Sequence, residues 1–199
     1  MEQRFLPDLN AGGFRAEYLM TPLEPYRQGA LDELCGLYAL FNASRLANQL
    51  LEDEECEKVF ALALRWLSEK KDFRHTLYKG LYGPELRSLY EGVFQNRWKT
   101  FTLKQPWGKS KPQNANDFWS RMEKEASRPN QGMVIAITAD DKEIDHWSVV
   151  RKITKEQIFL FDSYHPELHP SRRDCGYSKK CGLKYVIWAE EVLLLRNNR

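Results

Sequence analysis

Residues 32–51 read DELCGLYALFNASRLANQLL and are apolar on nearly every face of a helix. A surface helix carries one apolar stripe, whereas a helix that is apolar all round must be surrounded by protein. This stretch therefore predicts a central, buried helix. Asp32 is a candidate N-cap, because its side chain can accept a hydrogen bond from a free backbone N–H of the first turn.

Further helices are predicted after this one. Apolar residues recur at helical spacing from about Asp53 to Ser68, and again after Gly83-Pro84, where proline suits the first helical turn. The stretch NANDFWSRMEKEAS, residues 114–127, predicts a last long helix. The first half of the chain is thus mainly helical.

The second half has the pattern of a sheet. Five stretches favour strands: KTFTLK at 99–104, MVIAIT at 133–138, IDHWSVVR at 144–151, QIFLFDS at 157–163 and KYVIW at 184–188. No internal repeat or long linker separates the two halves. We therefore expect one α+β domain over residues 1–199, in which a helical lobe (about 25–97) packs on an antiparallel-sheet lobe (about 98–199). A cleft between two such lobes is a natural site.

Charge and composition exclude some partners. Thirty Lys and Arg stand against 28 Asp and Glu, and they are spread along the chain, so neither a nucleic-acid surface nor a nucleic-acid partner is indicated. The N-terminal MEQRFLPDLNAGGFRAEYL is too polar for a secretory signal, and no apolar run reaches membrane-spanning length. We expect a cytoplasmic chain without a membrane partner. Its four cysteines are too few for a disulfide framework and should be reduced.

Cys35 is a candidate nucleophile because it falls in the first turn of the predicted central helix. Unpaired amide N–H groups and the helix dipole place partial positive charge there, which favours a thiolate over a thiol. Gly36 beside it permits close approach of backbone or substrate. A lone cysteine in an apolar helix is more often a small buried hydrophobe, so the remaining evidence must come from elsewhere.

His146 and Asp162 supply that evidence, because both stand on predicted neighbouring strands. If the strands form a hairpin centred on Thr154, Val150 lies opposite Ile158 and His146 lies opposite Asp162. Opposed side chains of an antiparallel pair have Cβ atoms about 4.5–5.5 Å apart, within hydrogen-bonding reach. The carboxylate would then fix the imidazole tautomer and leave the other ring nitrogen for a thiol proton. A slip of one residue would place the two side chains on opposite faces.

With these residues in place, the chain resembles the papain-like superfamily, and within it the bacterial peptidases that remove bacteriocin leaders after a double glycine. Gln28 precedes the cysteine, CGLYALFN opens the helix, and HTLYKGLYGPELRSLYEGVF is similar to the helical insertion of that group. GMVIAI, HWSVV and IFLFDS then follow in the order of the family's glycine, histidine and aspartate strands. The resemblance covers roughly residues 25–165.

The resemblance implies a papain-like fold and a role for each matched residue. Cys35 would be the nucleophile, His146 the general base and later acid, and Asp162 the residue that orients His146. Gln28 would donate to the oxyanion together with the Cys35 backbone N–H, although it lies seven positions before Cys35, a wider interval than the papain pattern. The implied activity is that of a cysteine peptidase on a peptide or protein substrate, without a cofactor.

Two other functions remain open. Transglutaminases, deamidases and arylamine acetyltransferases share the Cys, His, Asp order, so the same residues could transfer an acyl group to another acceptor. A papain-like module with an inert thiol would instead serve as an interaction domain. The substrate pocket would be built from several loops, of which the one around Trp107 and Gly108 is a candidate.

A metal site is the competing interpretation of the C-terminal part. His165, His169, Cys175 and Cys181 fall within seventeen residues and could supply the nitrogen and sulfur ligands of a tetrahedral zinc ion. The spacing between the two cysteines is wider than in a usual zinc-knuckle pair, and a basic loop with glycine and proline explains the same residues without metal.

Overall fold

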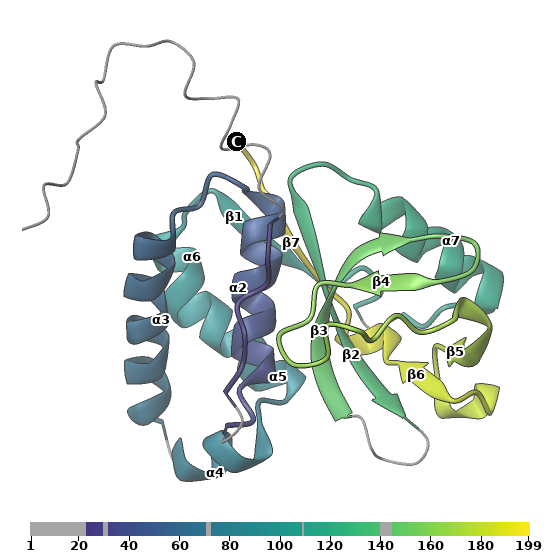
Figure 1. Cartoon of the computed structure of the whole chain (residues 1–199), viewed down its shortest axis with the longest axis horizontal. Coiled ribbons are helices and arrows are strands. Elements are labelled where there is room, and N and C mark those ends of the chain that lie inside the picture. The colour runs from purple at the N-terminus through teal and green to yellow at the C-terminus, as the bar shows by residue number, and fades with distance from the viewer. Residues whose placement is uncertain (1–22, 30–31, 71–72, 109, 140–144) are drawn as a thin grey trace, which may run out of the picture.

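The computed structural model describes residues 23–29, 32–70, 73–108, 110–139 and 145–199. The N-terminal stretch that argued against a secretory signal lies outside these residues. The described chain is α+β, with a group of helices on one face of a twisted sheet and helix α7 (Ala115–Ala126) on the other (Figure 1). No described helix has the length and apolarity that crossing a membrane would require.

The central helix is α2 (Cys35–Ala47), and it is shorter than the sequence predicts. It begins at Cys35, so Leu34 takes the N-cap position and no side chain caps the helix. The prediction of Asp32 as N-cap is wrong, because its carboxylate accepts the N–H of Leu34, two residues on, before the helix has started. The helix ends at Ala47, and Leu50, which lies beyond this end, is 82% exposed.

The other helices of this lobe pack around α2. Helix α3 (Asp53–Ser68) has the predicted bounds, and α4 (Phe73–Lys79) follows it. Pro84 stands in the first turn of α5 (Gly83–Leu89), as predicted. The helix then continues through a π-helical turn (Tyr90–Phe94) into α6 (Gln95–Arg97), and Phe94 from that turn packs against Phe41 of α2 with ring centroids 4.8 Å apart.

The sheet has seven strands in the described chain: β1 (Phe101–Lys104), β2 (Gln131–Ala139), β3 (Asp145–Ile153), β4 (Ile158–Leu160), β5 (Cys175–Gly176), β6 (Tyr185–Ile187) and β7 (Leu193–Asn197). Their main order is β1-β7-β2-β3-β4, and all these pairs are antiparallel. Strand β6 also pairs with β2, while β5 joins β6 in parallel. The C-terminal β7, which was not predicted, thus lies inside the sheet.

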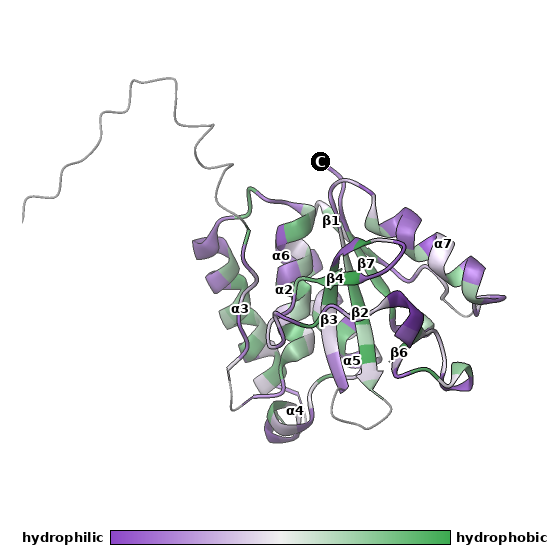
Figure 2. Cartoon of the chain, turned by 45° about the vertical axis from the view of Figure 1, so that its right-hand side comes forward, coloured by the Kyte–Doolittle hydropathy of each residue, from purple (hydrophilic) through white to green (hydrophobic). Residues whose placement is uncertain are grey.

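The sheet separates two apolar clusters, because successive strand residues point to opposite faces. Val134 of β2 packs with α2, whereas its neighbours Met133 and Ile135 pack with Phe118 of α7. Figure 2 shows the apolar residues concentrated on α2 and the central strands. The helical lobe therefore lies on one side of the sheet, and the start of α2 comes close to the start of β3.

Candidate active site

Cys35 is the first residue of α2 and lines a cleft between the helical lobe and the sheet. Its side chain is nearly buried, and Sγ lies 3.9 Å from the carbonyl oxygen of Glu33. Because the first backbone N–H groups of a helix have no partner within the helix, they and the helix dipole favour negative charge at this position.

Trp147 brings the histidine strand against this helix start. Its indole Nε1 donates to the carbonyl of Leu81 in the helical lobe at 2.7 Å, and both residues are buried. A Cβ atom added at Gly36 would lie 3.2 Å from the Trp147 ring, so the glycine permits this close packing. Gly36, which follows Cys35, is therefore in contact with Trp147, which follows His146.

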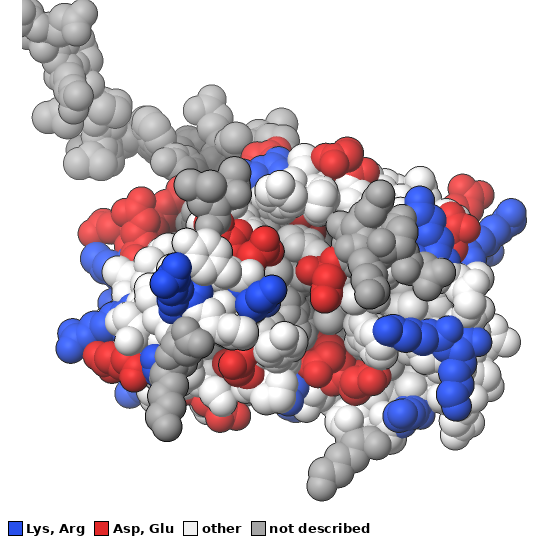
Figure 3. Space-filling view, turned by 90° about the horizontal axis from the view of Figure 1, so that it is seen from below, with Lys and Arg blue, Asp and Glu red and all other residues white. Residues whose placement is uncertain are grey.

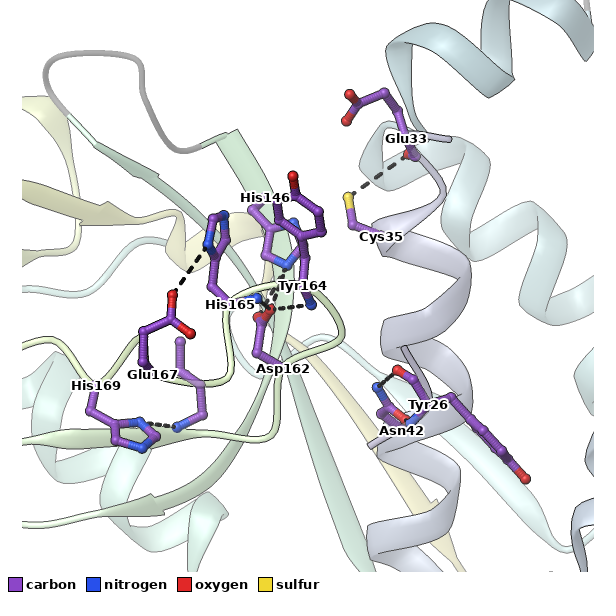
Figure 4. Close-up of polar contacts among 11 residues, drawn as sticks. Tyr26, Glu33, Cys35, Asn42, His146, Asp162, Tyr164, His165, Glu167 and His169 are labelled. Carbon is purple, nitrogen blue, oxygen red and sulfur yellow. Dashed lines mark hydrogen bonds and ion pairs between the residues drawn. The ribbon is translucent and has the colours of Figure 1, made fainter. Parts of the chain in front are cut away.

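His146 and Asp162 are both buried and form a direct contact. The imidazole Nε2 lies 3.1 and 3.0 Å from the two carboxylate oxygens of Asp162. The other ring nitrogen, Nδ1, is then left free for Cys35, whose sulfur is near enough to influence the imidazole, although no hydrogen bond of regular geometry joins the two side chains. Figure 4 shows the His146 ring, which comes from β3, between the carboxylate and the start of α2. The structure thus brings together the three residues predicted as a triad.

The register that makes this contact differs from the predicted one. Val150 pairs with Leu160 rather than with Ile158, and a bulge interrupts the pairing between Val150 and Lys152. The bond from Phe161 N to Val149 O continues the observed register, which places Asp162 opposite Ser148 and diagonal to His146. The prediction that His146 stands directly opposite Asp162 is wrong by two residues. An even slip keeps both side chains on one face, so they still meet.

Asp162 is held by the loop that follows it. Its Oδ1 accepts the backbone N–H groups of Tyr164 at 2.8 Å and of His165 at 2.6 Å, which is the behaviour of an aspartate that starts a turn. The His165 ring packs edge-on against His146 with centroids 5.7 Å apart. Sequence reasoning missed these contacts, although an aspartate at the end of an apolar strand, before Ser-Tyr-His, is a turn signal that could have indicated them.

The pair controls its own protonation. Burial alone would lower the pKa of His146, but the hydrogen bond and charge of Asp162 and the nearby Cys35 sulfur raise it to about 10. Burial would raise the pKa of Asp162, but the hydrogen bond and charge of His146 hold it below its ordinary range. Ser148 contributes in the same direction, although its Oγ forms no hydrogen bond of regular geometry. At neutral pH the imidazole keeps its proton, the state that can pair with a thiolate.

The cleft beside these residues has a volume of about 750 Å³. Leu81, Val186 and Trp188 contribute apolar surface to it. Its charged residues, which sequence reasoning did not single out, are Glu33, Lys79, Asp145, Lys179, Glu190 and Glu191. Figure 3 shows the face of the molecule with the hollow between the lobes and acidic side chains on both sides of it. The cleft is large enough for several residues of an extended peptide.

The loop around Trp107 and Gly108 does not line this cleft. Trp107 is 4% exposed and stacks on Phe118 in the apolar cluster on the α7 side of the sheet. The expectation that this loop helps to build the substrate pocket is therefore wrong.

Gln28 lies beside the triad but donates elsewhere. Its side-chain Nε2 donates to the carbonyl of Asp32, and its backbone N–H donates to the carbonyl of Ser163 at 3.1 Å. Its Oε1 is buried without a partner. One N–H of the side-chain amide is thus used within the loop that precedes Cys35, and the second has no partner among the described residues.

The four residues of the zinc alternative have separate surroundings, and Cys181 Sγ lies 3.7 Å from Ser178 Oγ. His169 Nδ1 accepts the N–H of Leu160 at 3.4 Å, while His165 pairs with Glu167 at 3.8 Å. Cys175 is buried, and burial followed by the charge of Asp174 raises its pKa to about 12. In the described part of the chain no group of three or more His, Cys, Asp or Glu side chains could hold a metal ion.

The chain matches no protein-family model, no curated protein and no solved structure. The assignment of a function therefore depends on the geometry of the site.

Proposed function

We propose that this chain is a papain-like cysteine peptidase, in which Cys35, His146 and Asp162 act as a catalytic triad. The observation that carries the proposal is the buried contact of His146 Nε2 with Asp162, which leaves Nδ1 for the thiol at the start of α2. A thiol at a helix start, beside a base that a third residue orients, is the arrangement of an activated nucleophile.

The chemical steps follow from the proton positions. The Cys35 thiolate attacks the carbonyl carbon of the scissile amide and forms a C–S bond. His146 Nδ1 then gives its proton to the departing amine, which leaves a thioester on Cys35. Water attacks the thioester while the now neutral His146 takes its proton, and release of the acid restores the thiolate. Asp162 holds the imidazolium through Nε2 in both steps.

The negative oxygen of each tetrahedral intermediate needs donors. The free backbone N–H of Cys35 at the helix start is one, because α2 has no side-chain cap that would use the first N–H groups. The second donor, by resemblance to the papain-like family, is the remaining N–H of the Gln28 side-chain amide. One donor thus belongs to the first residue of α2 and the other to the segment that precedes the helix.

Alkylation of the thiols tests the proposal. With iodoacetamide at pH 6–7, Cys35 should react at least about tenfold faster than an ordinary thiol, because the helix start and the neighbouring imidazole favour the reactive thiolate. The chain contains matched references, since Cys181 is more exposed than Cys35, and Cys56 and Cys175 are buried with raised pKa values. His146→Ala should slow the labelling of Cys35 and leave that of Cys181 unchanged.

Two labelling results would contradict the proposal. Labelling of Cys35 no faster than that of Cys181, or labelling indifferent to His146→Ala, would mean an inert thiol. If the thiol is reactive, mass spectrometry of a peptide mixture incubated with the native chain and with Cys35→Ala identifies the reaction. Hydrolysis splits a peptide with gain of water, whereas transfer to an added amine with no hydrolysis in its absence would contradict the peptidase assignment and favour acyl transfer.

A further inference from the structure

Residues 23–29, here called the strap, run beside α2 towards its first turn (Figure 1). Near the end of the helix, Arg45 Nη1 donates to the carbonyl of Glu24 at 2.5 Å. Two strap residues later, the main chain of Tyr26 meets Asn42, one helical turn closer to the nucleophile. Strap and helix are therefore antiparallel, and the strap ends near Cys35.

Asn42 makes the firmest of these contacts. Its side chain is fully buried, its Oδ1 accepts the N–H of Tyr26 at 2.7 Å, and its Nδ2 donates to the carbonyl of Tyr26 at 3.2 Å (Figure 4). A buried polar group costs stability unless it is paired, so an apolar residue would serve this central helix better if packing were its sole requirement. The two hydrogen bonds to the strap therefore explain why this buried position carries an amide side chain.

The same stripe of α2 carries the nucleophile. Cys35, Tyr38, Asn42 and Arg45 follow each other at helical intervals of three or four residues, so they lie on one side of the helix. Asn42 is seven residues, or about 10 Å along the axis, from Cys35. No hydrogen bond joins it to either member of the His146–Asp162 pair, and its side chain instead holds the main chain of the strap.

The free end of the strap connects the two sides of the site. The Gln28 main chain donates to the carbonyl of Ser163, the residue after Asp162, while its side chain donates to the carbonyl of Asp32, three residues before Cys35. Gln28 thus joins the loop that leads into the nucleophile to the loop that carries the carboxylate.

We propose that Asn42 is a positioning residue, which fixes the strap so that Gln28 holds the Cys35 and Asp162 loops at a constant separation. The inference rests on the proposed thiol chemistry. When the Asn42 contacts are lost, Gln28 and the Asp162 loop shift relative to α2. The imidazole Nδ1 of His146 then no longer points at the Cys35 thiol. A displacement of about 1 Å by a change far from the reacting atoms can reduce a rate by about a hundredfold.

Alkylation with iodoacetamide isolates this effect. The thiolate displaces iodide from a saturated carbon, so no oxyanion forms and the rate reports only the state and placement of Cys35. Asn42→Ala should slow the alkylation of Cys35 by about tenfold or more at pH 6–7 and move its pH dependence towards that of an ordinary thiol. Thermal unfolding of the same samples shows that the variant is folded.

Tyr26→Phe is the matched control on the same strap residue. It removes the contact of the hydroxyl with Asp53 at 2.5 Å, but leaves both main-chain bonds to Asn42. Its stability should fall while its alkylation rate and pH profile stay native. A general loss of stability thus lowers the unfolding temperature without changing the alkylation of Cys35, whereas a loss of positioning slows the alkylation.

Gln28→Ala gives a second, independent test at the free end of the strap. Alkylation of Cys35 should slow in this variant too, whereas a Gln28 that serves solely as an oxyanion donor would leave alkylation native and impair acyl chemistry alone.

A folded Asn42→Ala variant whose alkylation rate and pH profile are native overturns the proposal. If Asn42→Ala does not fold, native alkylation of Gln28→Ala overturns it instead. If His146→Ala slows the alkylation of Cys35 but neither Asn42→Ala nor Gln28→Ala does, the strap inference is wrong and the proposed function stands. If His146→Ala does not slow it, the proposed function is wrong, and the strap inference is wrong with it.

Discussion

His146 lies buried between a carboxylate and a thiol, and both raise the pKa of its imidazole. A histidine whose pKa is raised on folding stabilises the fold fully below its unfolded pKa of about 6.5, and this stabilisation is lost as the pH rises through the folded value, about 10 here. Asp162, whose pKa is lowered, stabilises the fold above about pH 4 and loses this effect in acid. The pair therefore stabilises the protein most between about pH 4 and 6.5.

Asp162→Ala should reveal this pH window. Removing one partner of a buried pair costs about 3 kcal/mol, and the variant also leaves the N–H groups of Tyr164 and His165 without their acceptor. We expect the difference in unfolding free energy between native chain and variant to be largest near pH 5.5 and to shrink towards pH 10. Urea unfolding at pH 5.5, 7.5 and 9.5 measures it. A difference that grows with pH would contradict the raised pKa of His146.

Asp162→Asn separates the charge from the shape of the same side chain. The amide retains an oxygen acceptor but no longer holds the imidazolium, so the pKa of His146 should fall and Cys35 should be less often a thiolate at neutral pH. We expect alkylation of Cys35 at pH 6 to slow by about tenfold or more, since one pKa unit is a factor of ten in thiolate. Ser163→Ala is the control, because the neighbouring Oγ is buried and forms no hydrogen bond. Equal rates in the two variants would exclude a role for the carboxylate charge.

At the scale of elements, the position of α2 on the sheet depends on Gly132 in β2. A Cβ atom there would lie 2.2 Å from the carbonyl oxygen and 2.6 Å from the Cα of Ala43, and backbone atoms of a central helix cannot move aside locally. Gly132→Ala should lower the unfolding free energy by about 3 kcal/mol, at the upper end of the usual cost of overpacking. Thermal unfolding measures the loss as a lower Tm.

Gly108→Ala is a glycine change with no neighbour to displace. Gly108 has a φ of 53°, and no atom of the described residues lies within 4 Å of an added Cβ, so the variant carries the strain of the left-handed conformation alone, about 1 kcal/mol. A Tm loss in Gly132→Ala no greater than in Gly108→Ala would show that α2 is free to shift on the sheet.

The elements differ in how far their sequences predict them. Helix α3 has its predicted bounds, because its apolar stripe and acidic first turn are local signals. Strand β7 was missed, since its pairing with β1 and β2 depends on residues far away in the chain. The β3–β4 hairpin was predicted with the wrong register because its turn lies at Thr154–Gln157 and a bulge in β3 precedes the turn, and no glycine marks either feature.

The candidate site shows the same division. Local patterns and family resemblance were enough to select Cys35, His146 and Asp162, since strand alternation keeps the last two on one face whatever even register is adopted. The contacts that hold these residues were not predictable in this way. Trp147 reaches the carbonyl of Leu81, 66 positions away in the chain, and a main-chain acceptor leaves no mark in the sequence.

At the scale of the whole molecule, the candidate site joins the proposed nucleophile, from the helical lobe, to the proposed base, from the sheet. The geometry of the site therefore depends on how these two parts pack against each other. The Trp147–Leu81 bond crosses that interface at the residue beside His146. Trp147→Phe keeps an aromatic ring but leaves the buried Leu81 carbonyl without its donor, which should cost about 1–3 kcal/mol. Since the lobes can then shift against each other, alkylation of Cys35 should also slow severalfold.

Trp98→Phe distinguishes an interface effect from the loss of an indole bond. Trp98 is as buried as Trp147, but its Nε1 donates to Glu55 at 3.3 Å within the helical lobe. Both variants should lower the Tm, measured by thermal unfolding, because each loses one hydrogen bond of a buried indole. Alkylation of Cys35, measured on the folded proteins, should slow in Trp147→Phe alone. Equal slowing in both variants would mean that the reactivity of Cys35 follows overall stability, and native reactivity in both would mean that the lobes keep their relative position without this bond.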